Sequence, residues 1–156
     1  MLIIGDKAPL NVFLVDSEGQ TTSLKSFLGT TVVIYFYPRD ATPGCTVEAC
    51  SIRDWMGELG KLNVEVIGVS KDSVESHKKF LAKQKLNFHL WSDPEHKLME
   101  AFRVWGERSF MGRTYMGTSR STFVINPKGL IAHVWEQVTP QDHGEEIYEY
   151  VNKSRK

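Results

Sequence analysis

Two cysteines, Cys45 and Cys50, are the residues of this sequence best suited to chemistry. They are the only cysteines in 156 residues, and they lie in one short segment. A thiolate is a nucleophile and a metal ligand, and two nearby thiols can form a reversible disulfide. One pair cannot supply the disulfide framework of a small secreted domain. A free cysteine is often only a small buried apolar residue, so the surrounding residues must decide whether this pair is reactive.

The residues before Cys45 predict that its sulfur lies at the beginning of a helix. Proline favours the first helical position, so Pro43 predicts that Thr42 is the N-cap and Cys45 the third helical residue. There the sulfur lies beside unpaired backbone N–H groups and the positive end of the helix dipole, and both favour the thiolate. We expect the Thr42 hydroxyl to donate a hydrogen bond to this sulfur.

The spacing of Cys45 and Cys50 excludes a disulfide within an intact helix. Helical residues five positions apart point ~140° away from each other, and their Cα atoms are ~8.7 Å apart. A disulfide tolerates a Cα separation of roughly 7 Å at most. If the two cysteines pair, the first turns of the helix must therefore unwind.

Other uses of the cysteines fit the sequence less well. A thiol–disulfide exchanger uses C-x-x-C, whereas the spacing here is C-x-x-x-x-C. A zinc site would need further ligands, but no second cysteine pair exists and no histidine is suitably spaced beside these two. A cysteine hydrolase would need a histidine base, for which no position is obvious. From a different class, a redox-switched binding or chaperone module stays open as the alternative.

The composition is that of an ordinary globular protein, with 41% hydrophobic and 24% charged residues. Nineteen basic residues balance nineteen acidic ones, which argues against binding of nucleic acid or an anionic membrane. The longest apolar run, residues 32–37, suits a buried strand and is too short to span a membrane. The N-terminus has no basic region and no long apolar region of a signal peptide. We expect a cytoplasmic protein with one domain over residues 1–156.

The chain alternates predicted strands and helices. Strands are expected at residues 11–15, 20–23, 31–37, 64–70, 90–92, 121–125 and 130–135. The first helix is expected to begin at Pro43, with an apolar face of Cys45, Ala49, Ile52, Met56 and Leu59. A second is expected from the capping-box pair Asp72 and Glu75 to Gln84, and a third over 94–102. The last is expected after Thr139-Pro140, with Ile147, Tyr148 and Val151 facing inward. Residues 103–120 are expected to form a loop with an irregular strand.

This order predicts an α/β protein with a thioredoxin-like fold. A βαβ unit is followed by a helix-containing insertion and a ββα unit, so helices flank a central mixed β-sheet, with an N-terminal β-hairpin in front. The strand at 31–37 is apolar without alternation, as expected for a central strand that is covered on both faces.

The segment from Tyr35 to Cys50 closely resembles the active-site segment of the Q-type peroxiredoxins, the bacterioferritin comigratory protein group. It contains the peroxiredoxin pattern P-x-x-x-T-x-x-C as Pro38, Thr42 and Cys45. A second cysteine five residues later is typical of the Q-type branch. Residues 104–115 and 120–125 also resemble this group, and the likeness covers nearly the whole chain.

The resemblance assigns roles to particular residues. It implies that Cys45 is the peroxidatic cysteine, Cys50 the resolving cysteine and Arg120 the active-site arginine. The remaining implied site residues are Thr42 on the thiolate and peroxide, Pro38 and Pro43 as a shield from water, Gly44 in the motif, and Glu48 holding the arginine. The fold supports Arg120 independently, because the start of an antiparallel strand at 121–125 lies at the same sheet edge as the end of strand 31–37.

The activity implied is that of a thioredoxin-dependent thiol peroxidase. Hydrogen peroxide or an organic hydroperoxide would oxidise Cys45 to a sulfenic acid, Cys50 would resolve it as an intramolecular disulfide, and thioredoxin would reduce that disulfide. No metal, haem or flavin is needed. The implied role is antioxidant defence and cell redox homeostasis. We expect a monomer, because the resolving cysteine lies in the same chain, and no nucleic-acid or membrane partner.

Overall fold

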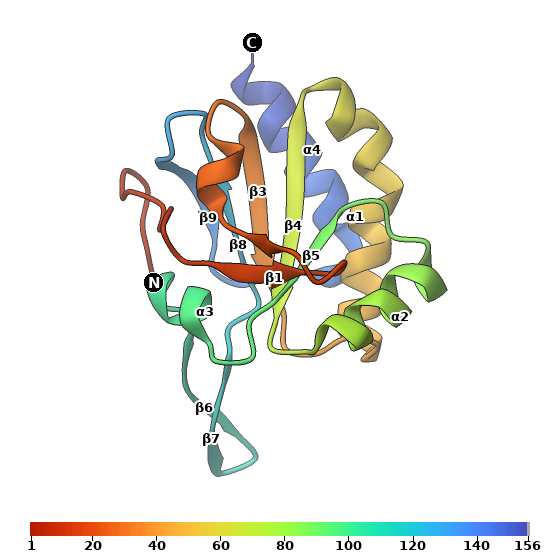
Figure 1. Ribbon diagram of the computed structural model, residues 1–156, viewed down its shortest axis with the longest axis vertical. Coiled ribbons are helices and arrows are strands. Elements are labelled where there is room, and N and C mark those ends of the chain that lie inside the picture. Colours follow the sequence, from red (N-terminus) through yellow and green to blue (C-terminus); the bar gives the residue numbers. More distant parts are fainter. Residues whose placement is uncertain (156) are drawn as a thin grey trace.

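A seven-stranded mixed β-sheet forms the centre of the protein in this computed structural model, which describes residues 1–155 (Figure 1). In spatial order the strands are β2 (Thr21–Thr22), β1 (Leu14–Asp16), β5 (His89–Ser92), β4 (Val64–Ser70), β3 (Thr31–Phe36), β8 (Ser121–Ile125) and β9 (Ile131–Trp135). The sheet confirms the predicted mixed architecture, with the parallel strands β3, β4 and β5 next to the antiparallel β8 and β9.

Strand β3 lies in the middle of the sheet and is buried on both faces, as its apolar sequence predicts. Side chains alternate along a strand, so Val33 and Tyr35 enter one core cluster while Ile34 and Phe36 enter the other. The β3–β8 register pairs Phe36 with Ser121, which brings the residue before β8 to the end of β3.

Helices cover both faces of the sheet. One face carries α1 (Pro43–Lys61), α2 (Val74–Gln84) and α4 (His143–Ser154), and α1 and α4 lie side by side (Figure 1). The other core cluster includes residues of the N-terminal segment, of the short helix η1 (Leu24–Phe27) and of α3 (Lys97–Ala101). Within residues 1–155, the longest and most apolar helices still fall short of what crossing a membrane requires.

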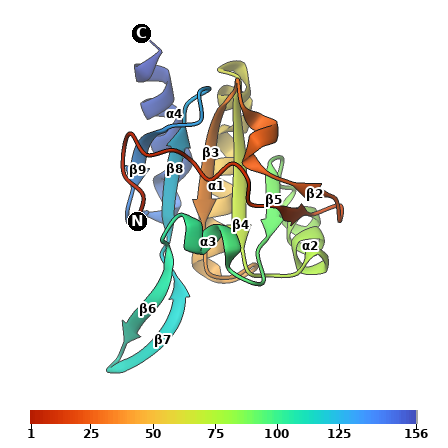
Figure 2. The ribbon, with the colours of Figure 1, turned by 60° about the vertical axis from the view of Figure 1, so that its left-hand side comes forward.

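Residues 103–120 differ from the prediction of a loop with an irregular strand. They contain two antiparallel strands, β6 (Trp105–Phe110) and β7 (Arg113–Thr118). These strands pair with each other as a separate two-stranded sheet, which projects from the central sheet (Figure 2). Its turn residues Met111 and Gly112 both have positive φ, at 50° and 79°. Tight hairpins favour such a turn, but the usual residues at its centre are Asn-Gly or Asp-Gly. The Met-Gly pair therefore did not indicate a hairpin in the sequence.

Three predicted helix boundaries shift for local reasons. Ser73 rather than Asp72 caps α2, because its hydroxyl accepts the backbone N–H of Ser76. Helix α3 is shorter than 94–102, since the Asp93 carboxylate accepts the N–H groups of the residues that begin it. Pro140 begins a short 3₁₀ turn, η2 (Pro140–Asp142), before α4 starts at His143.

Candidate active site

Helix α1 presents Cys45 at its N-terminus, as the Thr-Pro pair predicts. Pro43 is the first helical residue and Thr42 is the N-cap in extended conformation, with its carbonyl accepting the Thr46 N–H at 2.8 Å. Cys45 is the third helical residue and only 1% exposed. It packs in the core cluster with Tyr37 and Ala49. The sulfur therefore lies at the positive end of a 19-residue helix and away from bulk water.

Arg120 reaches this sulfur from the start of β8. Its Nη2 atom donates to Cys45 Sγ at 3.2 Å, and its Nη1 atom donates to Glu48 Oε1 at 2.7 Å. A Cβ atom at Gly44 would lie 3.3 Å from the same Nη2, so glycine leaves room for the guanidinium. Three residues in the first turns of α1 thus meet one arginine from the sheet edge where the fold places it.

Glu48 is a buried acid whose charge depends on Arg120. Burial raises the pKa of Glu48 from 4.5 to about 7, although the neighbouring Arg120 lowers it. Its second oxygen, Oε2, has no hydrogen-bond partner among the described residues. Burial alone would lower the pKa of the Arg120 guanidinium, but Glu48 and Cys45 raise it above its ordinary value. Arg120 therefore stays charged between a sulfur and a carboxyl group.

The Thr42 hydroxyl does not bond the sulfur as predicted. It donates to the backbone carbonyl of Arg39 at 3.0 Å, and no side-chain hydrogen bond caps the helix. A hydroxyl has one proton, so it cannot donate to Cys45 at the same time. The predicted Thr42–sulfur hydrogen bond is wrong for this conformation, whereas the Thr42 oxygen keeps lone pairs that can accept a hydrogen bond from a ligand.

Cys50 lies on the same intact helix and is half-buried. Both cysteines are free thiols, and Cys50 Sγ lies 3.5 Å from Gln84 Oε1 at the end of α2. The helix geometry keeps the two sulfurs apart in this state, in agreement with the spacing argument.

Known proteins resemble this chain in sequence and in fold. The sequence model of the AhpC/TSA family matches residues 4–134. The chain belongs to the AhpC/TSA family. It is 44% identical to peroxiredoxin Bcp of Escherichia coli over 149 residues, which is 96% of this chain and 95% of that protein. It is 46% identical to peroxiredoxin Bcp of Bacillus subtilis over 140 residues, or 90% of this chain and 88% of that one.

Solved structures agree with the sequence relatives. A mutant of peroxiredoxin Q from Xylella fastidiosa superposes with a TM-score of 0.94 at 34% identity, covering 100% of this chain and 99% of that one. The bacterioferritin comigratory protein of Xanthomonas campestris gives a TM-score of 0.91 at 35% identity, covering 99% of both chains. The chain is thus a peroxidase of the peroxiredoxin kind with a thioredoxin-like fold.

Two cavities border the predicted site residues of this peroxiredoxin. Arg120 lines a cavity of about 370 Å³ together with Met1 and Ser119, and its side chain is 23% exposed. Pro38 lines another of about 520 Å³ beside Trp105. Pro38 and Pro43 are both exposed, so they lie at the outer surface of the site.

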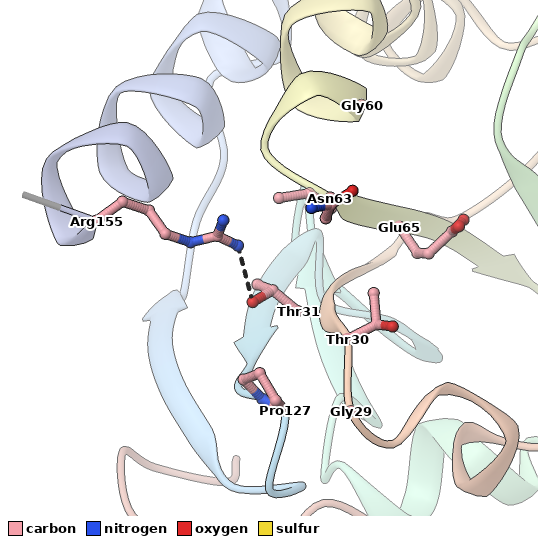
Figure 3. A pocket seen from close by; sticks show the side chains of 9 residues that line it. Gly29, Thr30, Thr31, Gly60, Asn63, Glu65, Pro127 and Arg155 are labelled. Carbon is pink, nitrogen blue, oxygen red and sulfur yellow. Dashed lines mark hydrogen bonds between the residues drawn. The ribbon is translucent and has the colours of Figure 1, made fainter.

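A cavity of about 620 Å³ at the opposite edge of the sheet is separate from this chemistry (Figure 3). It lies where β3 and β4 begin, whereas Cys45 follows the end of β3. Arg155 donates to the Thr31 hydroxyl at 3.1 Å in this region, and no cysteine is among the lining residues.

A buried histidine behind the site was not predicted from the sequence. His143 begins α4, and its Nε2 lies 2.7 Å from the hydroxyl of Thr122, two residues after Arg120. Burial lowers the pKa of His143 to about 3, with a smaller contribution from Arg120. The ring is therefore neutral, and it ties β8 to α4. The sequence marks only a helix start there, which gives no sign of this contact.

Proposed function

We propose that Cys45 is the nucleophile of a thiol peroxidase that reduces hydrogen peroxide and organic hydroperoxides. The observation that carries this proposal is the 3.2 Å contact between Arg120 Nη2 and Cys45 Sγ at a helix N-terminus. A guanidinium and a helix dipole both favour the thiolate over the thiol. The relative from Xanthomonas campestris is described as having alkyl peroxide reduction activity, which supports organic hydroperoxides as substrates.

The first step forms one S–O bond and breaks one O–O bond. The Cys45 thiolate attacks the nearer peroxide oxygen and becomes a sulfenic acid, while the other oxygen leaves as hydroxide or alkoxide and takes up a proton. A cation placed where negative charge develops stabilises the transition state more than the ground state. We expect Arg120 to do this, together with backbone N–H groups at the start of α1, while the Thr42 oxygen accepts a hydrogen bond from the peroxide O–H.

The second step is resolution by Cys50. Its thiol attacks the Cys45 sulfenic sulfur, which forms an intramolecular disulfide and releases water. Because the two residues share an intact helix, the first turns of α1 must unwind before the sulfurs meet.

The last step is reduction by an external dithiol, which we propose is thioredoxin. Two thiols of the reductant become a disulfide, and both cysteines return to thiols. In this cycle the enzyme acts as a monomer in the cytoplasm, in antioxidant defence and redox homeostasis, without metal, haem or flavin. Nucleic acid and membrane play no part.

The test is peroxide consumption with a thioredoxin system as the source of reducing power. We expect many turnovers for the wild type, none for Cys45→Ser, and about one peroxide per chain for Cys50→Ser. A wild-type protein that stops after one oxidation would be a redox-switched binding module instead. Full activity of Cys45→Ser would contradict the assignment of the nucleophile.

A further inference from the structure

The loop between β3 and α1 is fixed at one residue by a buried hydrogen-bond network. Asp40 is 7% exposed, and its carboxylate accepts from Tyr37 Oη at 2.6 Å, from Ser76 Oγ at 2.8 Å and from His77 Nδ1 at 2.7 Å. Its backbone N–H also donates to Asp72 Oδ2 at 2.7 Å. Asp40 lies two residues before Thr42, so this network holds the segment that leads directly into the helix start.

The partners of His77 determine how many protons the network contains. The ring is fully buried, and its Nε2 lies 3.0 Å from the carbonyl oxygen of Trp91, which can only accept. Nε2 therefore carries a proton. A second proton must lie between Nδ1 and the Asp40 carboxylate, since two bare acceptors at 2.7 Å would repel. Buried hydrogen bonds with such a shared or charged donor are among the stronger ones in proteins.

Helix α2 also contacts Cys50, the second cysteine of α1. Ser76 and His77 lie near its beginning, whereas Gln84 at its end receives Cys50 Sγ and accepts Arg53 Nη1 at 2.7 Å through its backbone carbonyl. Figure 1 shows α2 beside the first half of α1. The segment 40–50, which must rearrange before a disulfide can form, is therefore fastened to α2 on both sides of Cys45.

We propose that Asp40 and His77 are positioning residues that keep the start of α1 folded and so set the ratio of resolution to overoxidation at Cys45. This inference rests on the proposed peroxidase cycle. A helix start opens when the free energy of its local contacts is lost. The network thus favours the folded site, where Arg120 promotes attack on peroxide, and opposes the unwound state, where Cys50 can reach the sulfenic acid.

Two reactions compete for the sulfenic acid. Attack by the Cys50 thiol gives the disulfide and water. Attack of the sulfenate on a second hydrogen peroxide gives the sulfinic acid and water, with the peroxide reduced. A tighter network leaves the sulfenic acid in the folded site for longer, so more of it reaches the sulfinic state at high peroxide.

The test separates oxidation from resolution in rapid-mixing experiments on the full chain, with quenched samples analysed by intact mass. Asp40→Ala removes three side-chain hydrogen bonds. We expect it to speed disulfide formation about tenfold, a figure set by the loss of a hydrogen bond to a charged group. We also expect slower sulfenic acid formation and less sulfinic acid at excess peroxide. Ser76→Ala removes one bond from a half-buried residue, and about a twofold change in the same directions is expected.

Conservative and matched variants exclude a general loss of stability. Asp40→Asn can still accept from Tyr37 and donate to a neutral His77, so its rates should stay within about twofold of the wild type. Val151→Ala removes a buried side chain of α4, one turn before Arg155 binds the Leu62 carbonyl at the far end of α1. It should lower the melting temperature without changing the ratio of the two rates.

Different outcomes would overturn the positioning role of Asp40 and His77 and the proposed peroxidase cycle. Unchanged resolution and sulfinic acid yield in both Asp40→Ala and Ser76→Ala, or the same shift in Val151→Ala, would overturn the positioning role. If Asp40→Ala does not fold, Ser76→Ala and Asp40→Asn alone decide it. Failure of the wild type to form a sulfenic acid and then a disulfide would instead overturn the proposed cycle.

Discussion

At the scale of single residues, one guanidinium connects a sulfur and a carboxyl group. Arg120 donates to Cys45 and Glu48 with different nitrogens, so the positive charge that faces the sulfur is itself held in place by a carboxyl group. A planar guanidinium can bridge two acceptors in this way, whereas an ammonium group cannot do so in the same geometry.

Replacing Arg120 should slow peroxide attack by more than the loss of thiolate explains. We expect Arg120→Ala to reduce the second-order rate of sulfenic acid formation by about 10²–10³ at matched thiolate fraction, as for other preorganised donors to developing charge. Arg120→Lys keeps the positive charge, so its rate of sulfenic acid formation should lie between the rates of the wild type and Arg120→Ala. Stopped-flow rates across pH, divided by the thiolate fraction from ultraviolet absorbance, give the comparison. Equal corrected rates for wild type and Arg120→Ala would remove Arg120 from the transition state.

Glu48 should make the protein less stable as the pH rises towards neutrality. Its pKa is about 7 in the folded chain and 4.5 when unperturbed. Between these values the folded state binds more protons than the unfolded state, so the free energy of unfolding falls with rising pH. The total decrease in the free energy of unfolding is about 3 kcal/mol, and it is complete once the pH is above the pKa of Glu48 in the folded chain.

Urea denaturation of Glu48→Gln at pH 5 and pH 8 tests this sign. Relative to the wild type, Glu48→Gln should gain stability at the higher pH. Glu58→Gln, an exposed position on the same helix, is the matched control and should leave the pH dependence unchanged. A wild type whose stability relative to Glu48→Gln rises with pH would contradict the argument.

At the scale of elements, α1 connects the site to the rest of the fold. Its buried residues include Cys45, Ala49, Ile52 and Leu59, which the helical spacing predicted. Glu48 is also buried, outside that predicted face, where it accepts a hydrogen bond from Arg120. Helix α4 packs closely against it, with the Gly144 N–H donating to Ser51 Oγ at 2.9 Å. A displacement of α1 would move the cysteine with it.

Gly144 tests how closely these helices pack. A Cβ atom there would lie 2.2 Å from the Ser51 carbonyl oxygen, so the helices would have to separate. We expect Gly144→Ala to lower the free energy of unfolding by about 3 kcal/mol, the upper part of the range for overpacking. Gly57→Ala in α1 meets no atom within 4 Å and should stabilise the helix slightly. Thermal unfolding of both variants gives the comparison, and equal stability of the two would contradict the close packing.

At the scale of the whole molecule, strand order brings together residues far apart in the sequence. The position of Arg120 beside Cys45 was predictable, because an antiparallel β8 must begin where β3 ends. The Asp40–His77 network and the Thr122–His143 contact were not, since they depend on how helices settle against the sheet. The Thr42 hydroxyl donates to the Arg39 carbonyl and not to the Cys45 sulfur, and local sequence spacing cannot choose between these two acceptors.

The central claim is that Cys45 and Cys50 of one chain form a disulfide during turnover, and mass spectrometry of peroxide-treated protein tests it most directly. Cleavage after Glu48 separates the two cysteines, so an unreduced digest should contain their two peptides joined, and reduction should release them. The intact protein should have the mass of one chain less two hydrogens. A covalent dimer, or a sulfenic acid at Cys45 with Cys50 still free, would contradict the account.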